Sequence, residues 1–170
     1  MHAGPSPRRQ SQATGAMVTQ VMPEGTIAWV TGTAGTCVSI FKPVFVDVEW
    51  SGLPVPPTEQ YNPRSLWWKH EIMHRRAMAD FESVVPEIRQ EFDVLEREFI
   101  ANASAVLAGE PKEKRLFMEH CFHQAQRATE QWVRRLSGRG DLAFVDPAHH
   151  SIWHKYNRQA GIPEPMPPLA

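Results

Sequence analysis

Short apolar runs recur along the first third of the chain, and residues 16–22 among them have the alternating pattern of a half-buried β-strand. This pattern predicts four strand pieces, over residues 16–22, 26–31, 38–41 and 44–48. The turn-forming residues Pro23-Glu24-Gly25 join the first two pieces into a β-hairpin. Lys42 and Pro43 separate the last two pieces, and a proline there requires an edge position, a bulge or a break. A sheet this small has two open edges unless another element covers them.

From Ser65 onward the apolar residues recur at spacings of three and four, which is typical of amphipathic helices. Four helices are predicted: from Ser65 to about Phe81, from Pro86 to a stop at Gly109, from Pro111 to Gly138, and over 147–158. The apolar stripes of the first three contain Leu66, Met73, Ala77 and Phe81, then Ile88, Phe92, Leu95, Phe99, Ala103 and Val106, and finally Phe117, Cys121, Ala125, Ala128, Trp132 and Leu136. The aromatic side chains of these helices are therefore expected in the core rather than in a ligand cage.

This order of elements predicts an α+β fold, with β-hairpins first and about three to four helices after them. The chain divides into a disordered arm, a single domain and a proline-rich tail, at residues 1–12, 13–160 and 161–170. Within the domain, the β part is expected at 13–50 and the helical part at 64–158. A loop with four prolines, at 51–63, joins the two parts.

Charge and composition exclude several classes of protein. Eighteen Lys and Arg residues stand against nineteen Asp and Glu, for a net charge of −1, so neither a nucleic acid nor a membrane surface is expected as a partner. No apolar run approaches the length of a transmembrane helix, and the first residues show no hydrophobic signal-peptide pattern. Cys37 and Cys121 are too few for a disulfide scaffold and fit a reducing compartment, so a cytoplasmic protein is expected.

The most visible motif is His70-Glu71-Ile72-Met73-His74, an HExxH sequence. On a helix its two histidines lie one turn apart and can share a zinc ion, while Glu71 can act as general base on a zinc-bound water. A zinc hydrolase also needs a third protein ligand, and neither the HExxHxxGxxH extension nor a marked downstream glutamate supplies one. The alternative is a helix whose histidines pack beside tryptophans or cap neighbouring groups. His70, Glu71 and His74 are thus a candidate metal site with zinc as the alternative cofactor; otherwise no cofactor is expected.

Other reactive side chains give weaker signals. His120 and His123 share a helix face, but Cys121 belongs to the apolar stripe and is expected to be structural. Cys37 lies in a strand-like run with no activating pattern, and Lys42 is expected to be solvated at a strand end. No GxSxG elbow and no phosphate-binding loop occur, so local motifs assign no catalytic residue. The C-terminal histidines are expected on the surface: His149, His150 and His154.

Several segments occur together in the order and at the spacing of a known family. They are Ser11-Gln12-Ala13-Thr14-Gly15-Ala16-Met17-Val18, Trp29-Val30-Thr31-Gly32-Thr33, Ser39-Ile40-Phe41-Lys42-Pro43, and Ser65-Leu66-Trp67-Trp68-Lys69-His70-Glu71 with His74-Arg75. This set resembles the secernin-like dipeptidases, which are N-terminal-nucleophile hydrolases. The resemblance covers roughly residues 10–160. It also accounts for the HExxH pattern without zinc, because that family is not one of zinc proteases.

The resemblance implies a four-layer αββα sandwich and hydrolysis of peptide or amide bonds. In that class the nucleophile, a cysteine in this family, is the first residue of the mature chain, and its own α-amino group serves as the base. This chain begins with Met1-His2, and both of its cysteines are internal. The matched region is therefore expected to be the C-terminal half of such an enzyme, inactive alone, and no catalytic residue is carried over. The expected partners are the N-terminal half or a second copy of the chain, with a peptide as substrate of the complete protein.

Three functions stay open at this point. The first is the secernin-like dipeptidase or amidohydrolase segment. The second is a non-catalytic interaction module that binds a partner through an open β edge or a helical face. The third is a small zinc hydrolase built on His70, Glu71 and His74.

Overall fold

A three-stranded sheet forms the β part of the chain, in a computed structural model that describes residues 11–52, 54–137 and 147–163. The strands are β1 (Met17–Met22), β2 (Gly25–Val30) and β3 (Lys42–Phe45). They pair antiparallel in the order β1-β2-β3, and β1 and β2 form the predicted hairpin. In β3, Pro43 lies opposite Trp29 of β2. Because β3 is an edge strand of this sheet, the proline occupies one of its expected positions.

Four α-helices follow the sheet among the described residues. They are α1 (Leu66–Ala77), α2 (Phe81–Leu107), α3 (Pro111–Ser137) and α4 (Pro147–Gln159). The predicted starts at Ser65, which is the N-cap residue of α1, and at Pro111 are confirmed. The predicted break at Pro86 is wrong: a 3-10 turn, η2 (Met78–Asp80), separates α1 from α2, and Pro86 lies in the second turn of α2. None of the described helices is both long and apolar enough to cross a membrane.

The strand predicted over 38–41 is wrong. The chain instead makes a 3-10 turn, η1 (Thr36–Val38), which begins after Gly35 with its left-handed φ of 62°. Side chains of α2 then take the backbone groups that a neighbouring strand would use. Arg89 donates to the carbonyl oxygen of Ser39 at 2.8 Å, and the Phe41 N–H donates to Glu96 Oε1 at 2.8 Å. Because of these partners the segment stays irregular, and the strand predicted over 44–48 lies instead at 42–45.

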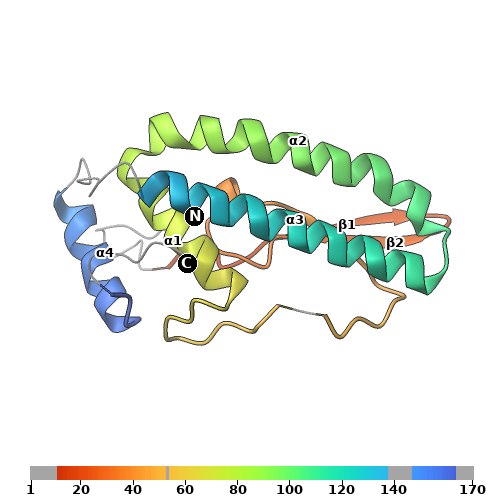
Figure 1. The fold of residues 1–170 in the computed structure, drawn as a ribbon, viewed down its shortest axis with the longest axis horizontal. Coiled ribbons are helices and arrows are strands. Elements are labelled where there is room, and N and C mark those ends of the chain that lie inside the picture. The colour runs from red at the N-terminus through yellow and green to blue at the C-terminus, as the bar shows by residue number, and fades with distance from the viewer. Residues whose placement is uncertain (1–10, 53, 138–146, 164–170) are drawn as a thin grey trace.

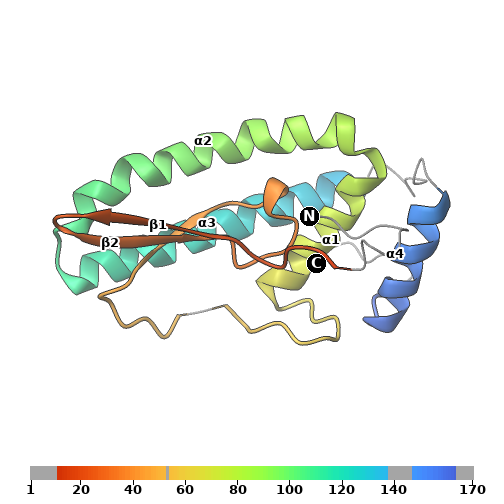
Figure 2. The same ribbon diagram turned by 180° about the vertical axis from the view of Figure 1, so that it is seen from behind.

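The two longest helices, α2 and α3, run antiparallel beside each other along the sheet (Figure 1). Both pack on the strands, α2 on β2 and β3 and α3 on β3. Together they bury a common core whose largest members include Ile27, Phe45, Phe92, Met118 and Trp132. From behind, the β1–β2 hairpin is on the near side with no helix in front of it (Figure 2). The described helices therefore cover one side of this hairpin.

The apolar stripes of the helices largely line this core, as predicted. Residues of all three predicted stripes are buried, among them Met73, Ala77, Ile88, Phe99, Ala103, Cys121, Ala125 and Leu136. Phe81 is an exception with 37% of its surface exposed. It begins α2 instead of ending α1, so it does not share the buried face of α1.

The two edges of the sheet differ, although both were expected to be open. β3 packs beside α3, and the Phe45 N–H is directed at Met118 Sδ, 3.4 Å away. No described strand lies beyond β1, where Met17, Val18 and Val21 are 66%, 56% and 77% exposed. One edge is thus covered by a helix, and β1 is the open edge. Residues 1–10 of the expected arm and 164–170 of the expected tail lie outside the described residues.

Candidate functional site

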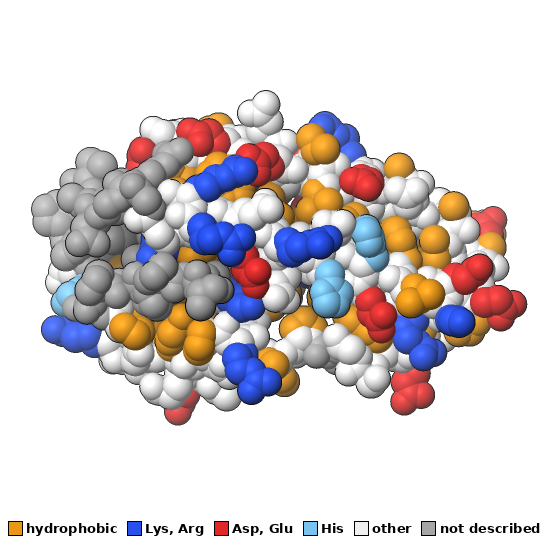
Figure 3. Space-filling model, in the orientation of Figure 1, with side chains coloured by type: hydrophobic (Ala, Val, Ile, Leu, Met, Phe, Trp, Pro, Cys, Tyr) orange, Lys and Arg blue, Asp and Glu red, His pale blue; other side chains and the backbone are white. Residues whose placement is uncertain are grey.

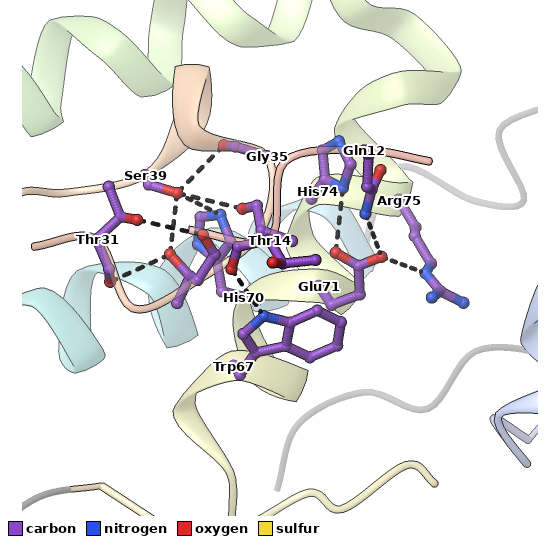
Figure 4. Close-up of polar contacts among 12 residues, drawn as sticks. Gln12, Thr14, Thr31, Gly35, Ser39, Trp67, His70, Glu71, His74 and Arg75 are labelled. Atoms are coloured by element: carbon purple, nitrogen blue, oxygen red, sulfur yellow. Dashed lines mark hydrogen bonds and ion pairs between the residues drawn. The ribbon is translucent and has the colours of Figure 1, made fainter. Parts of the chain in front are cut away.

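The segments that carry the family resemblance meet around α1, although they are far apart in the sequence (Figure 4). Gln12, at the start of the first segment, donates from Nε2 to Glu71 Oε1 at 3.3 Å across 59 positions. The indole N–H of Trp67 donates to the carbonyl oxygen of Thr14 at 3.2 Å. The second and third segments meet at the contact of Thr33 with Ser39, and Ser39 in turn contacts His70 of α1. These motif residues therefore lie together in one polar cluster around α1, which we call the α1 cluster.

On one side of α1, His70 joins the loop before β3. Ser39 Oγ lies 3.1 Å from His70 Nε2, 2.9 Å from Thr33 Oγ1 and 3.1 Å from the carbonyl oxygen of Gly35. Ser39 and His70 are 0% and 2% exposed. Desolvation by burial, with the nearby charge of His74 adding to it, lowers the pKa of His70 to about 3. His70 is therefore a neutral imidazole at pH 7, and the geometry gives it a structural role.

On the other side of α1, Glu71 holds a buried ionic group together. His74 Nδ1 lies 3.2 Å from Glu71 Oε2, and Arg75 Nε donates to Glu71 Oε1 at 3.0 Å. Arg75 also donates to Asn157 Oδ1 and so ties α1 to α4. Burial alone would raise the pKa of the Glu71 carboxyl, but the hydrogen bond and charge of His74 and those of Arg75 outweigh it and hold this pKa below its ordinary value. Glu71 is therefore ionised, and both of its carboxylate oxygens already have a hydrogen-bond partner on α1.

The expectation that Lys42 is solvated is wrong. Lys42 is 2% exposed, and its Nζ donates to the carbonyl oxygens of Thr31 and Ile40 at 2.5 and 2.7 Å. The same ammonium lies 5.4 Å from the ring centroid of Phe122 on α3. Desolvation lowers the pKa of Lys42 to about 7, while the negative charge of Glu96 opposes that shift. The position of β3 against α3 buries this side chain, which the sequence places at an ordinary strand end.

The HExxH residues do not converge on a common metal position. His70 Nε2 is hydrogen-bonded to Ser39, whereas His74 Nδ1 is hydrogen-bonded to Glu71. Within the described ranges, no group of three or more His, Cys, Asp or Glu side chains is placed to hold a metal ion. The zinc alternative on His70, Glu71 and His74 therefore stays a prediction that a binding measurement decides.

We expect the purified protein to contain no stoichiometric zinc and to keep its melting temperature when EDTA is added. The reason is that Ser39 and Glu71 already hold the two histidine rings that would have to turn toward an ion. Metal analysis and thermal unfolding with and without EDTA check this. A fall in melting temperature on chelation that added zinc reverses, and that His74→Ala abolishes, would place the ion at the HExxH helix instead.

Because the fold keeps His70 neutral, we expect the protein to lose stability in mild acid. The folded-state pKa of about 3 lies below the ordinary value of 6.5, so between these limits the unfolded chain binds the extra proton. The contribution of His70 to the free energy of unfolding is fully present above pH 6.5. Below that pH the free energy of unfolding falls by up to about 1.4 kcal/mol for each pH unit. Urea unfolding of the wild type and of His70→Gln between pH 6.5 and 5 measures this contribution. Equal pH slopes in the two proteins would contradict it.

The other candidate side chains lie apart from the α1 cluster. His120 and His123 are exposed on α3, whereas Cys121 between them is buried, as expected for a structural cysteine. Burial, together with the charge of Glu98, raises the pKa of the Cys121 thiol to about 12. Cys37 is exposed on η1 rather than in a strand. His154 is half-buried on α4, and the side chains of His149 and His150 lie outside what the structure describes.

The sequence analysis named Ser39 and Arg75 only within the family segments, and it did not predict the contacts that they make around α1. Arg75 follows Glu71 at a spacing of four, which is the spacing of a helical ion pair, so this contact had a signal in the sequence. Ser39 and Asn157 had none, because their partners on α1 are 31 and 82 positions away. The burial of Lys42 likewise had no local signal.

Comparisons with known proteins give no match to this chain. No family model matches it, and the searches of curated proteins and of solved structures also give no match. The evidence for the family resemblance is therefore the matching segments themselves and the positions that these segments take in the fold.

Proposed function

We propose that this chain is the C-terminal segment of a secernin-like dipeptidase or amidohydrolase, within an αββα sandwich. The observation that supports the proposal is the α1 cluster. Segments that resemble one family, separated by up to 59 positions, are hydrogen-bonded neighbours around a single helix. Unrelated chance matches would have no reason to lie together, whereas motifs that stabilise a shared fold would.

In this proposal the chain supplies scaffold, and the nucleophilic cysteine belongs to the N-terminal half. That thiolate attacks the amide carbonyl carbon while the α-amino group of the same cysteine takes the thiol proton. The proton passes to the departing amine, and water then hydrolyses the thioester to release the acid. The buried Cys121, with its raised pKa, is unsuited to such a role. We therefore expect no amide hydrolysis by this chain alone.

The test begins with the DNA upstream of the codon for Met1, examined in every forward frame for a segment that begins Met-Cys. When that segment is expressed with this chain, the complex should hydrolyse dipeptides, and each part alone should not. Replacement of the terminal cysteine by alanine is the matched control, since it removes the nucleophile and leaves the assembly intact. Turnover by this chain alone, or an upstream region without such a segment, would contradict the proposal.

The open β1 edge favours a second function, a non-catalytic module that binds a partner by strand addition. The strand MVTQVM contains no charged residue and no proline, which are the usual means of protecting an edge. An added strand would hydrogen-bond to the backbone of β1, and its side chains would pack beside the exposed Met17, Val18 and Val21. In this function the partner is the N-terminal half or a second copy of the chain.

We expect Val21→Lys to weaken this association by about tenfold or more, because a charge on an edge strand opposes pairing. Val21 is 77% exposed, so the free energy of unfolding should change by no more than about 0.5 kcal/mol. Light scattering over a range of protein concentrations, with and without the candidate partner, measures the association. Val46→Lys, at a position 62% exposed outside β1, is the matched control. If both variants weaken association equally, or the wild type associates with nothing, β1 is not the contact.

A further inference from the structure

A small cavity lies between α3, the proline-containing segment that follows β3 and the start of α1. Its volume is about 210 Å³, and the residues that matter in its wall are Trp50, Gly52, Leu66, Glu119, Phe122 and His123. In Figure 3 the surface is hollowed between the histidines of α3 and the segment that crosses beneath this helix. Three elements therefore enclose this space: α3, the segment after β3 and the first residue of α1.

One wall of the cavity is aromatic. The rings of Trp50 and Phe122 meet edge to face, with centroids 4.8 Å apart. Phe122 already has the Lys42 ammonium near its face, so Trp50 is the ring available to another cation. The indole N–H of Trp50 is buried and has no acceptor among the described residues. Gly52 keeps this wall in place, because a Cβ there would lie 2.4 Å from Trp50 Nε1 and would displace the ring.

The α3 wall is acidic. Glu119 and His123 lie one helical turn apart and both line the cavity. The Glu119 carboxylate makes no ion pair or hydrogen bond with any residue that the structure describes, unlike Glu130 on the same helix, which is paired with Lys69 at 2.6 Å. A carboxylate and aromatic rings that line the same cavity can together bind an organic cation. The imidazole of His123 adds a second polar side chain to this wall.

We propose that this cavity binds a primary ammonium group on a short alkyl chain, as a lysine side chain or a small free amine presents it. The ammonium donates to Glu119, and the alkyl chain lies against Trp50 and Leu66. The volume suits this ligand, since a cavity of about 150 Å³ holds a molecule the size of benzene, whereas whole-ligand sites are about 300 Å³ or larger. The site is independent of the dipeptidase proposal and uses none of the residues of the α1 cluster.

The test is a titration of the full chain with Nα-acetyl-lysine methylamide at pH 8. The probe of binding is the indole N–H signal of Trp50 in a ¹H–¹⁵N spectrum, identified among the six tryptophans by its loss in Trp50→Phe. We expect a saturable shift of this signal. Nα-acetyl-norleucine methylamide, which has the same alkyl chain without the charge, should bind at least about tenfold more weakly. n-Butylamine represents a free amine in the same titration. If the lysine compound binds more tightly than n-butylamine, the natural ligand is a lysine side chain of a peptide; if the two bind equally, it is a free amine.

Glu119→Gln is the decisive variant, because it keeps the shape of the side chain and removes its charge. It should weaken binding of the lysine compound by about tenfold. Glu98→Gln, at an exposed position of α2 outside the cavity wall, makes the same change in net charge and should leave binding unchanged. Thermal unfolding of both variants confirms that the fold is intact. The proposal is overturned if the norleucine compound binds equally well, if Glu119→Gln binds as the wild type does, or if the Trp50 signal never saturates.

Discussion

Glu71→Gln is expected to lower the free energy of unfolding by about 3–5 kcal/mol, because breaking a buried ion pair leaves its partner charge uncompensated. The side chains of Glu71 and Arg75 are 0% and 6% exposed, so water does not replace the lost contact. His74 loses a hydrogen-bond partner in the same change. Urea unfolding at pH 7 measures the effect. Glu71→Gln combined with Arg75→Met should recover part of the loss, since it removes the unpaired cation.

Asp93→Asn is the matched control for this prediction. Asp93 pairs with Arg89 at the same helical spacing of four that separates Glu71 from Arg75. Its side chain is 48% exposed, however, so solvent screens the pair and its loss should cost less than about 1 kcal/mol. Equal costs for the two variants would show that burial does not strengthen the Glu71 contacts.

Gly35→Ala is expected to destabilise the protein by about 2–5 kcal/mol, from two separate causes. Gly35 has a φ of 62°, a left-handed conformation that costs a residue with a Cβ about 1–2 kcal/mol. The new Cβ would also lie 2.6 Å from His74 Cδ2, and relieving such overpacking in a core costs about 1–3 kcal/mol. The buried His74 ring is held by Glu71, so it has little room to move away.

Gly32→Ala separates the two causes. Gly32 has nearly the same φ, 59°, but a Cβ there would meet nothing within 4 Å. It should therefore cost only the backbone strain, about 1–2 kcal/mol. The difference between the two variants in urea unfolding is the contribution of the contact with His74. No difference between them would mean that the ring yields without cost.

These two predictions bear on function because they treat the α1 cluster as scaffold. If this chain completes a dipeptidase, Glu71→Gln should lower the amount of assembled complex and leave the turnover of each complex unchanged. A catalytic carboxylate would give the opposite result, with normal assembly and lost turnover. Measurement of both quantities on the same preparation distinguishes a positioning residue from a catalytic one.

Local patterns predicted much of the fold. The strand-like runs at 16–22 and 26–31 with a turn between them predict the β1–β2 hairpin, and the starts at Ser65 and Pro111 are those of α1 and α3. The failures at 38–41 and at Pro86 have different causes. At 38–41, side chains of α2 take the backbone groups that a strand would pair, whereas near Pro86 the 3-10 turn η2 ends α1 earlier in the chain, so α2 begins before the proline.

The site was much less predictable from the chain alone. The HExxH spacing places His70 and His74 on one helix, and the same spacing explains the pairing of Glu71 with Arg75, because helical neighbours are set by the local backbone. Whether those side chains face a metal, each other or a distant loop depends on what packs against α1. The contact of His70 with Ser39, the burial of Lys42 and the cavity beside α3 all join segments far apart in sequence. The periodicity of apolar residues in the sequence indicates which face of a helix or strand is buried. The partner of a buried polar group, in contrast, is determined only when the elements pack together.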